Sequence, residues 1–389
     1  MTKRVLFLIS DTGGGHRAGA TAIGAALDEI EGPTRFEWRV VDIAAHCTFP
    51  LSKLGPAYSA ALRYAPPIYG ALYHVTNGRR RYRTIVRFCE PLYRERLRSV
   101  FTEYRPDVIV SVHPLLNHAA LRARADAGMD HVPIVTVITD LGRVHEGWLL
   151  PEADLTVVPA REVYQRALQR GVPADRLRLL GHPIHPRFED VTGTKTEIRK
   201  KLGLPENATV ALLMAGGEGG GKLLPTTLAL ARAGLDFHLV VVTGRNAALK
   251  AKLEQLAPSL PTPMTVLGFR NDVPELMRAS DLLVTKAGPG TIAEASVAEV
   301  PVVVYDYVPG QERGNLDYVR TNGIGVVALT TAAVVQSVAR IVHNQERLTK
   351  MRAQQTAVAP RGSSRRISEL IAAIAVSGRR PKTTVSVAG

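Results

Sequence analysis

The chain has 389 residues, of which 46% are hydrophobic and 22% charged, values that exclude a disordered protein and suggest two globular domains. Two cysteines exclude a disulfide framework and favour a reducing compartment. The 49 basic and 35 acidic residues leave a net charge of +14, which indicates an anionic partner: a nucleic acid, an anionic lipid surface or a phosphorylated substrate.

The first residues, MTKRVLFLIS, are basic and then apolar for only five residues before Asp11. This pattern predicts a first β-strand rather than a signal peptide. No apolar run in the sequence approaches the roughly 20 residues that a membrane-spanning helix needs. We therefore expect a soluble or peripheral protein.

Short apolar runs alternate with helical patterns along the chain. Near-continuous Val, Ile and Leu in such runs predict α/β domains with parallel strands covered by helices on both faces. The expected strands of the first half are Val5–Ile9, Phe36–Val41, Val108–Val112, Ile134–Ile138 and Leu155–Val158. Those of the second half are Thr209–Met214, Phe237–Thr243, Met264–Leu267, Leu282–Val284 and Val302–Tyr305.

A polar stretch at 190–201, preceded by the two prolines of GHPIHPRF, separates the two halves. It predicts an N-terminal domain at 1–190 and a C-terminal domain at 191–376. The polar, basic residues 377–389 are expected to form a disordered tail. Two such α/β domains leave a cleft at the carboxyl ends of their strands, where ligands of these sheets bind.

The glycine-rich stretch SDTGGGHRA follows the first expected strand. Gly13, Gly15 and Ala18 match the dinucleotide-binding pattern G-x-G-x-x-G/A. Against a dinucleotide site, His16 falls in the first helical turn, where its side chain would crowd a pyrophosphate. A simple strand-to-helix turn is the other interpretation, but it leaves His16 without a role.

His16 at a helix N-terminus is a candidate general base. The positive end of the helix dipole disfavours the imidazolium form, and a neutral imidazole can accept a proton from a hydroxyl group. Such a base needs an acceptor to orient its other nitrogen. Asp140, at the end of an expected strand, and Asp11, close in sequence, are the two candidates.

A second glycine-rich loop, AGGEGGGK, follows the strand expected at Thr209–Met214. Residues 216–222 match G-x-x-x-x-G-K, but Leu223 stands where a nucleoside triphosphatase needs Ser or Thr for Mg²⁺. The backbone N–H groups of such a loop can still hold a diphosphate. No D-x-D pair occurs in the sequence, so no carboxylate-held metal is expected.

Two polar stretches follow later strands. In DLLVTKAGPGTIAEA the strand should end at Lys286 and a helix begin near Thr291. Two interpretations of Glu294 stay open: it is the third residue after Thr291 and caps the helix in a capping box, or its carboxylate accepts hydrogen bonds from ribose hydroxyls. In YDYVPGQERGN the amide and carboxylate groups suit sugar hydroxyls; they belong to Gln311, Glu312 and Asn315.

Residues 63–98 contain nine arginines, five tyrosines and only two glutamates. Arginine and tyrosine together suit contact with a membrane at the level of the lipid headgroups. RNA binding and an ordinary solvated helix face are the alternatives.

Taken together, these motifs give the whole chain a resemblance to the monogalactosyldiacylglycerol synthase and processive diacylglycerol glucosyltransferase family, within the family 28-like glycosyltransferases. The motifs are SDTGGGHRA, SVHPL, TDLGRVHEGW, GGEGGG, GFRNDVPELMRASDLLVTKAGPGTIAEA and DYVPGQERGN.

The resemblance implies a GT-B fold, in which two Rossmann-like domains turn their parallel sheets toward a central cleft. It implies an inverting 1,2-diacylglycerol 3-β-glycosyltransferase that moves a hexose from UDP-galactose or UDP-glucose to a diacylglycerol-type lipid, without a cofactor or metal. We expect residues 63–98 to bind an anionic membrane rather than a nucleic acid, and the protein to be cytoplasmic and peripheral on the inner face of the cell membrane.

The resemblance also assigns roles to individual residues. His16 is implied as the general base, with Asp140 in the catalytic set. The acceptor side would comprise Gly14, Gly15, His113 and Trp148. The donor side would comprise Gly217, Gly219 and Gly220 at the diphosphate, Phe269 and Arg270 at the uracil, Gly288, Gly290 and Thr291 at the turn, Glu294 at the ribose, and Gln311, Glu312 and Asn315 at the sugar.

The chain departs from the family pattern on the acceptor side. His182 stands where relatives often carry another residue, and His145-Glu-Gly-Trp148 replaces the HPTW of plant enzymes. Two other functions stay open from the sequence: a UDP-sugar epimerase of similar architecture and a non-catalytic nucleotide-sugar binding protein.

Overall fold

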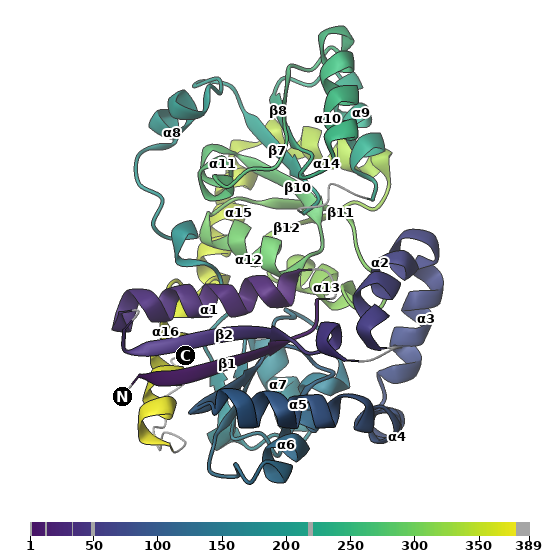
Figure 1. The fold of residues 1–389 in the computed structure, drawn as a ribbon. Helices are drawn as coiled ribbons and strands as arrows, with labels where there is room; N and C mark the ends of the chain where they lie inside the picture. Colours follow the sequence, from purple (N-terminus) through teal and green to yellow (C-terminus); the bar gives the residue numbers. More distant parts are fainter. Residues whose placement is uncertain (1, 12–13, 33, 48–50, 217–220, 379–389) are drawn as a thin grey trace. The chain divides into compact units, whose positions relative to one another are not determined.

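The structure, a computed structural model, describes residues 2–11, 14–32, 34–47, 51–216 and 221–378 (Figure 1). It divides into two compact units. The first unit comprises Met1–Pro186, Val308–Gly314 and Gly362–Gly389; the second comprises Arg187–Tyr307 and Asn315–Arg361.

The first unit is built on a parallel sheet that has six strands among the described residues, in the order β2-β1-β3-β4-β5-β6. Its strands are β1 (Lys3–Ile9), β2 (Phe36–Asp42), β3 (Val108–Ser111), β4 (Ile134–Val137), β5 (Leu155–Val158) and β6 (Leu177–Leu179). Its helices are α1 (Gly15–Glu31), α2 (Leu54–Tyr64), α3 (Pro66–Thr76), α4 (Arg79–Cys89), α5 (Pro91–Tyr104), α6 (Asn117–Asp126), α7 (Arg161–Gln169) and α16 (Ser363–Ser377).

Helices cover both faces of this sheet because successive strand residues point to opposite sides. Phe7 packs on one face with Ile23 of α1 and Ile371 of α16. Leu8 packs on the other face with Phe101 of α5, together with side chains of α6. The near-continuous apolar strands of the sequence are therefore explained by a sheet that is buried on both faces.

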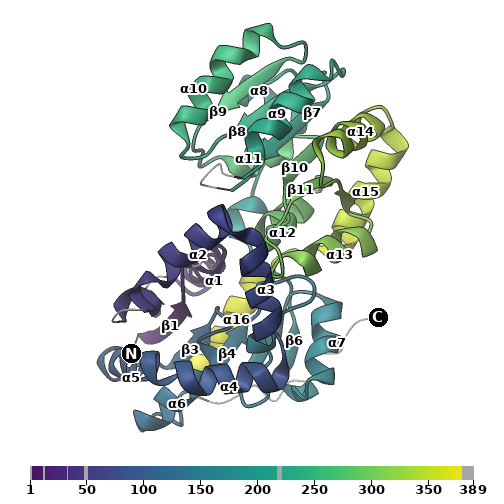
Figure 2. The ribbon, with the colours of Figure 1, turned by 90° about the vertical axis from the view of Figure 1, so that its right-hand side faces the viewer.

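The C-terminal helix α16 belongs to the first unit, contrary to the expected second domain at 191–376. Its residues Ile367, Ile371 and Ile374 enter the core beneath β1, and Ser368 Oγ donates a hydrogen bond to the carbonyl of Ile23 (2.7 Å). Both ribbon views place α16, drawn in yellow, beside the purple and blue elements of this unit (Figures 1 and 2). The helix ends at Ser377, and most of the expected tail, 379–389, lies outside the described residues.

The second unit contains a parallel sheet with six strands among the described residues, in the order β12-β11-β10-β7-β8-β9. Its strands are β7 (Val210–Met214), β8 (His238–Val242), β9 (Met264–Leu267), β10 (Leu282–Lys286), β11 (Val302–Asp306) and β12 (Gly325–Val327). Its helices are α8 (Lys195–Leu202), α9 (Leu223–Arg232), α10 (Ala247–Leu256), α11 (Val273–Ala279), α12 (Pro289–Val297), α14 (Thr331–Val342) and α15 (Gln345–Val358). Helix α13 (Arg313–Thr321) begins in the segment that groups with the first unit.

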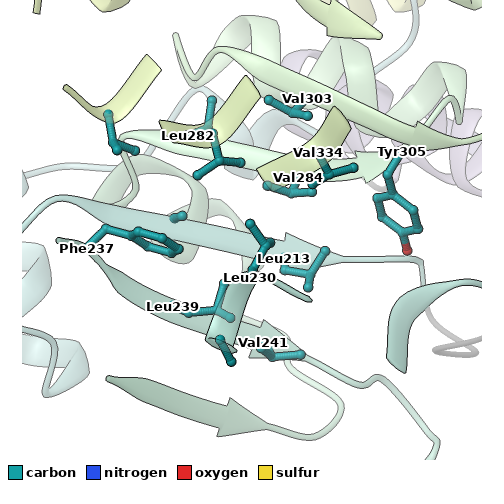
Figure 3. Close-up of a cluster of buried hydrophobic side chains, with 14 of the residues drawn as sticks. Leu213, Leu230, Phe237, Leu239, Val241, Leu282, Val284, Val303, Tyr305 and Val334 are labelled. Atoms are coloured by element: carbon teal, nitrogen blue, oxygen red, sulfur yellow. The ribbon is translucent and has the colours of Figure 1, made fainter. Parts of the chain in front are cut away.

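A single apolar cluster fills the space between one face of this sheet and its helices (Figure 3). Leu213, Leu239 and Val284 come from neighbouring strands, and Leu230 of α9 and Val334 of α14 close over them. This arrangement keeps the strand ends in fixed register, so the loops that follow them start from rigid positions.

The polar stretch that suggested a linker is mostly helix α8. Thr194 caps it in a capping box, in which Glu197 Oε2 accepts from the backbone N–H of Thr194 at 2.7 Å. Lys195 and Arg199 of α8 both bind Asp281 at the start of β10. The division between the units falls before this helix, at Pro186 and Arg187, rather than at residue 190.

Candidate active site

Gly14 and Gly15 lie at the start of α1. Gly14 is the N-cap residue and has a φ of 76°, a left-handed conformation that favours glycine. Among the residues that the structure describes, no atom lies within 4 Å of the position that a Cβ atom on either Gly14 or Gly15 would take. The next glycine, Gly19, packs closely against Thr139 and Pro183, which holds α1 in place at its first turns.

His16, the second residue of α1, is buried, with 7% of its surface exposed. Its Nδ1 lies 3.2 Å from the Thr139 hydroxyl, and its ring also forms a hydrogen bond with the backbone carbonyl of Val112. Burial lowers the pKa of His16 to about 4, although the Val112 carbonyl and the charge of Asp11 act in the opposite direction. At neutral pH the ring is therefore uncharged and able to accept a proton.

Asp140 does not take the orienting position that the sequence suggested. Its Oδ2 accepts a hydrogen bond from the indole Nε1 of Trp148 at 2.7 Å, and Thr139, one residue earlier, meets His16 instead. Burial raises the pKa of Asp140 to about 6, although the Trp148 hydrogen bond opposes this shift. The other candidate, Asp11, binds the guanidinium of Arg17 (2.9 Å) and acts on His16 only through its charge.

Aromatic rings surround His16. The His113 ring meets it edge-on with a centroid distance of 4.5 Å, and the fully buried Trp148 lies at 5.8 Å. Burial holds the pKa of His113 well below its ordinary value, and Nδ1 of His113 accepts from the backbone N–H of Leu115. The structure thus brings His16, Asp140, His113 and Trp148 together around an uncharged imidazole.

Thr139 and His182 are neighbours of His16 to which the sequence gave no role. His182 Nε2 lies 3.1 Å from the Thr139 carbonyl oxygen, and its Nδ1 lies 3.0 Å from that of Pro183. The only feature of the sequence that could have indicated these two residues is that each lies just after a strand, Thr139 after β4 and His182 after β6. Through this contact His182 helps to fix the backbone that presents Thr139.

The loop that contains Gln311 and Glu312 belongs to the same unit as His16, although it lies some 300 residues away in sequence. Glu312 is buried, and its Oε2 accepts from the backbone N–H of Val308 at 2.7 Å, which closes the loop on itself. Asn315, by contrast, groups with the second unit, where its Nδ2 donates to the carbonyl of Ala287 at 2.8 Å. The three residues predicted to contact a sugar therefore fall into two groups.

In the second unit, Phe269 and Arg270 follow β9. Phe269 is 52% exposed, and the guanidinium of Arg245 lies over its ring at 4.6 Å from the centroid. Arg270 forms an ion pair with Asp272. An exposed aromatic ring with a stacked cation can hold a planar base. The sequence analysis did not predict a role for Arg245. The only feature that could have indicated it is the polar stretch GRN, which follows shortly after β8.

Helix α12 begins at Pro289, with Gly288 as its N-cap residue, so Gly290 and Thr291 lie within its first turn. The capping-box interpretation of Glu294 is wrong, because Glu294 lies in the helix interior and Thr291 is not the cap. Burial raises the pKa of the half-buried Glu294 to about 7, and the positive charge of Arg187 opposes this rise. The N-terminal N–H groups of such a helix attract anions.

Gly217, Gly219 and Gly220 lie outside the described residues. Beyond them, Lys222 Nζ lies 3.3 Å from Asp306 Oδ1 at the end of β11. In the described ranges no group of three or more His, Cys, Asp or Glu side chains is placed to hold a metal ion. A reaction without a metal stays a prediction from the resemblance.

Comparison with known families identifies both halves of the chain. Residues 16–184 match the monogalactosyldiacylglycerol (MGDG) synthase family, and residues 222–366 match the glycosyltransferase family 28 C-terminal domain. The chloroplastic monogalactosyldiacylglycerol synthase of Spinacia oleracea is 35% identical over 347 residues, which are 87% of this chain and 66% of the relative. Monogalactosyldiacylglycerol synthase 3 of Arabidopsis thaliana is 35% identical over 359 residues, 90% of this chain and 76% of the relative. The chain thus spans about two thirds to three quarters of the length of these relatives.

Solved structures show the same fold. MurG of Acinetobacter baumannii superposes with a TM-score of 0.62 at 14% identity, covering 95% of this chain and 99% of MurG. The S. aureus MnaA–UDP structure gives a TM-score of 0.63 at 15% identity, covering 98% of this chain and 99% of MnaA. At these identities the likeness concerns the fold alone. The chain belongs to the monogalactosyldiacylglycerol synthase family of glycosyltransferases and has their GT-B fold.

Proposed function

We propose that this protein is an inverting glycosyltransferase that moves a hexose from a UDP-sugar to the hydroxyl group of diacylglycerol or a related membrane lipid. The observation that carries the proposal is the buried, uncharged His16 beside Gly14 and Gly15 at the start of α1, in a chain of this family. The names of the relatives specify a galactosyl product, so UDP-galactose is the first donor to test and UDP-glucose the second.

In the proposed mechanism the His16 imidazole removes the proton of the lipid hydroxyl. The hydroxyl oxygen then forms a bond to the anomeric carbon as the bond from that carbon to UDP breaks on the opposite face. An α-linked donor therefore gives a β-glycoside, as in a 1,2-diacylglycerol 3-β-glycosyltransferase. Thr139 and the Val112 carbonyl hold the ring during this transfer, and the proton remains on His16 until the product leaves.

The second unit supplies the groups for the nucleotide. Phe269 and Arg245 offer a stacking platform for the uracil, and the Glu294 carboxylate can accept hydrogen bonds from both ribose hydroxyls. The N-terminus of α12 offers N–H groups and a positive dipole to the diphosphate, and these would stabilise its charge as it departs. No metal or cofactor is part of this proposal.

A lipid acceptor requires a surface that binds membranes, and α3 and α4 provide one. Ile68, Leu72 and Val75 are 72%, 59% and 53% exposed and lie at positions i, i+4 and i+7 along α3. The exposed arginines of α4 follow directly; they are Arg79, Arg80, Arg81, Arg83 and Arg87. An aliphatic stripe beside basic side chains suits an anionic leaflet.

The tyrosines expected at this surface mostly point inward, which corrects the sequence interpretation. Tyr82 and Tyr93 are buried, and the Tyr82 hydroxyl donates to the carbonyl of Pro114 at 3.0 Å. The exposed hydrophobic side chains of this region instead include the aliphatic residues of α3 together with Tyr64 and Phe88. None of the helices among the described residues is long and apolar enough to cross a membrane. We propose peripheral binding at the inner face of the cell membrane.

The function is tested by incubating the purified protein with liposomes that contain diacylglycerol and with radiolabelled UDP-galactose, UDP-glucose or UDP-glucuronic acid. Label that is extracted with the lipid supports the proposal, and the most efficient donor identifies the sugar. An epimerised sugar nucleotide in the aqueous phase would support an epimerase instead. Binding of UDP-sugar without any turnover would support a non-catalytic binding protein.

A further inference from the structure

Two tyrosine hydroxyls meet a single amide oxygen in the first unit. Tyr58 of α2 and Tyr69 of α3 both donate hydrogen bonds to Oε1 of Gln311, at 3.1 and 2.9 Å. The two rings are nearly perpendicular, with centroids 5.3 Å apart. An amide oxygen has two lone pairs, so these two donors fill its capacity.

The hydroxyls donate here because an amide oxygen can only accept, and both tyrosines keep the protons that they donate. Burial raises the pKa of Tyr58 and of Tyr69, and the nearby carboxylates of Asp140 and Glu312 raise both further. With its oxygen satisfied, the Gln311 side chain has only its Nε2 hydrogens left to offer to a ligand. The amide is therefore a hydrogen-bond donor at this point of the site.

The loop is also fixed in position against α3. A Cβ atom on Gly310 would come within 2.8 Å of the Tyr73 side chain, and a Cβ atom on Gly70 would come within 2.8 Å of Pro309. A glycine on each side thus allows helix and loop to interlock at van der Waals distance. Because Tyr69 and Tyr73 lie one turn apart on α3, the same face of the helix packs against the loop and binds its amide.

Asp140 connects this cluster to His16. Its charge acts on Tyr58, Tyr69 and Tyr73, and its own carboxylate binds Trp148, the indole that lies beside the His16 ring. The Gln311 amide is therefore held by groups that also border the proposed general base. A sugar hydroxyl bound by this amide would therefore have a fixed position relative to the oxygen that His16 deprotonates.

We propose that Tyr58 and Tyr69 are positioning residues that orient the Gln311 amide so that its NH₂ group donates to a hydroxyl oxygen of the donor hexose, which sets the selectivity among UDP-hexoses. This inference rests on the proposed function, in which a UDP-hexose is the donor. Hexoses that differ in the configuration of one hydroxyl present that oxygen in different directions, so an amide fixed at its oxygen can distinguish them.

The test compares Tyr58→Phe, Tyr69→Phe and the double variant. Each replacement removes one hydroxyl group and keeps the aromatic ring. Tyr164→Phe on α7 is the matched control. The measurement is the ratio of kcat/KM for UDP-galactose to that for UDP-glucose, with diacylglycerol liposomes as acceptor. We expect this ratio to move toward unity by about tenfold in the double variant, mainly through KM. Tyr164→Phe should keep the wild-type ratio.

To distinguish positioning of the amide from a purely structural role of the tyrosines, the same replacements are made in a protein that also has Gln311→Ala. If the tyrosines act through the amide, the double variant should change the ratio no further once Gln311 is alanine. A wild-type ratio in Tyr58→Phe/Tyr69→Phe, or an equal change with and without Gln311, would overturn the inference.

Calorimetric binding of UDP-galactose and UDP-glucose to the same variants keeps this test independent of turnover. If the wild-type protein transfers no sugar, the proposed function fails, and the ratio of the two dissociation constants still decides the inference. A ratio that changes in the double variant supports positioning by the tyrosines, and an unchanged ratio contradicts it.

Discussion

The indole Nε1 of Trp148 donates to Oδ2 of Asp140 at 2.7 Å, and this bond gives the carboxylate a partner other than His16. The hydroxyl of Thr139 therefore has the orienting position beside His16 Nδ1. The proposed base is held by a neutral hydroxyl and a backbone carbonyl rather than by a carboxylate. Replacing His16 and replacing Asp140 should consequently have different effects on kcat.

We predict that His16→Ala lowers kcat by about 10²–10⁴-fold, because it removes the general base. Asp140→Asn keeps an oxygen acceptor for the Trp148 indole and should lower kcat much less. Initial rates in the liposome assay measure both, and His131→Ala, at an exposed histidine, is the control. Wild-type turnover in His16→Ala would remove this residue from the mechanism.

The pH dependence of kcat should reflect the low pKa of His16. Burial lowers this pKa to about 4, and the reaction needs the unprotonated ring. The value of kcat at saturating substrate should therefore show no loss attributable to His16 between pH 8 and about pH 5, and should fall as the pH approaches 4. An acidic limb centred near 6.5, the ordinary histidine value, would contradict the burial seen here.

Donor binding should depend on pH through a different residue. Glu294 has a pKa of about 7, and its ionised form can accept a ribose hydroxyl on each oxygen, whereas protonation turns one oxygen into a donor. The KM for UDP-sugar should therefore rise as the pH falls below 7, approaching about tenfold per pH unit well below the pKa. Glu294→Gln should raise KM at pH 8 and make it independent of pH. A wild-type KM that stays constant between pH 6 and 8 would argue against this role.

Asp281 should be important for the stability of the second unit. It binds Lys195, Arg199 and Arg352 at 2.9, 2.6 and 2.9 Å. Burial raises the pKa of its carboxyl, but Lys195, the backbone N–H of Val210 and Arg199 outweigh burial and hold this pKa below the ordinary value. Asp281→Ala leaves the buried Arg199 without its counter-charge and should lower the free energy of unfolding by about 3–5 kcal/mol.

Chemical denaturation followed by circular dichroism measures this change. Asp317→Asn, which removes an exposed ion pair with Arg320, is the matched control and should have little effect. Because the folded-state pKa of Asp281 is depressed, its contribution should be present above the unfolded pKa of about 3.9 and be lost as the pH falls through the folded value. Equal stability of the Asp281→Ala variant and the wild type would show that the ion pairs contribute nothing net.

Membrane binding should depend on the exposed face of α3. We predict that Ile68→Ser/Leu72→Ser/Val75→Ser weakens sedimentation with anionic liposomes at all salt concentrations, because it removes apolar contact area. Replacing Arg79, Arg80, Arg81 and Arg83 with Gln should weaken binding mainly at low salt, where screening is weakest. Leu168→Ser, at an exposed leucine of α7, is the control. Unchanged binding in both sets would rule out this surface.

The sequence predicts the strands well, because a buried parallel strand is a nearly continuous apolar run. Each of the ten expected strands is found among the described residues, whereas β6 and β12 were missed. Each of these two is three residues long, and β6 carries Arg178 at its centre. Runs of this length have no periodicity that separates them from loops.

The partners within the site are harder to predict than its members. The family resemblance assigned His16, His113, Asp140 and Trp148 to the site. The sequence offered Asp140 or Asp11 as the partner of His16, whereas the structure has Thr139 there, and that difference depends on side-chain directions at adjacent positions. Similarly, the DYVPGQERGN motif indicates that Gln311 matters, while Tyr58 and Tyr69 bind it from more than 240 residues away. Contacts of this kind are set by tertiary packing and leave no local pattern.

Helix α16 has a consequence for how the molecule is made. Its isoleucines complete the core around β1, so this early strand depends on residues that are synthesised much later. The second unit lies between them in the chain, and its own apolar cluster uses no residue beyond Met351 among those described. During synthesis, therefore, the second unit can complete its core first, and the N-terminal half of the protein is the part that finishes folding last.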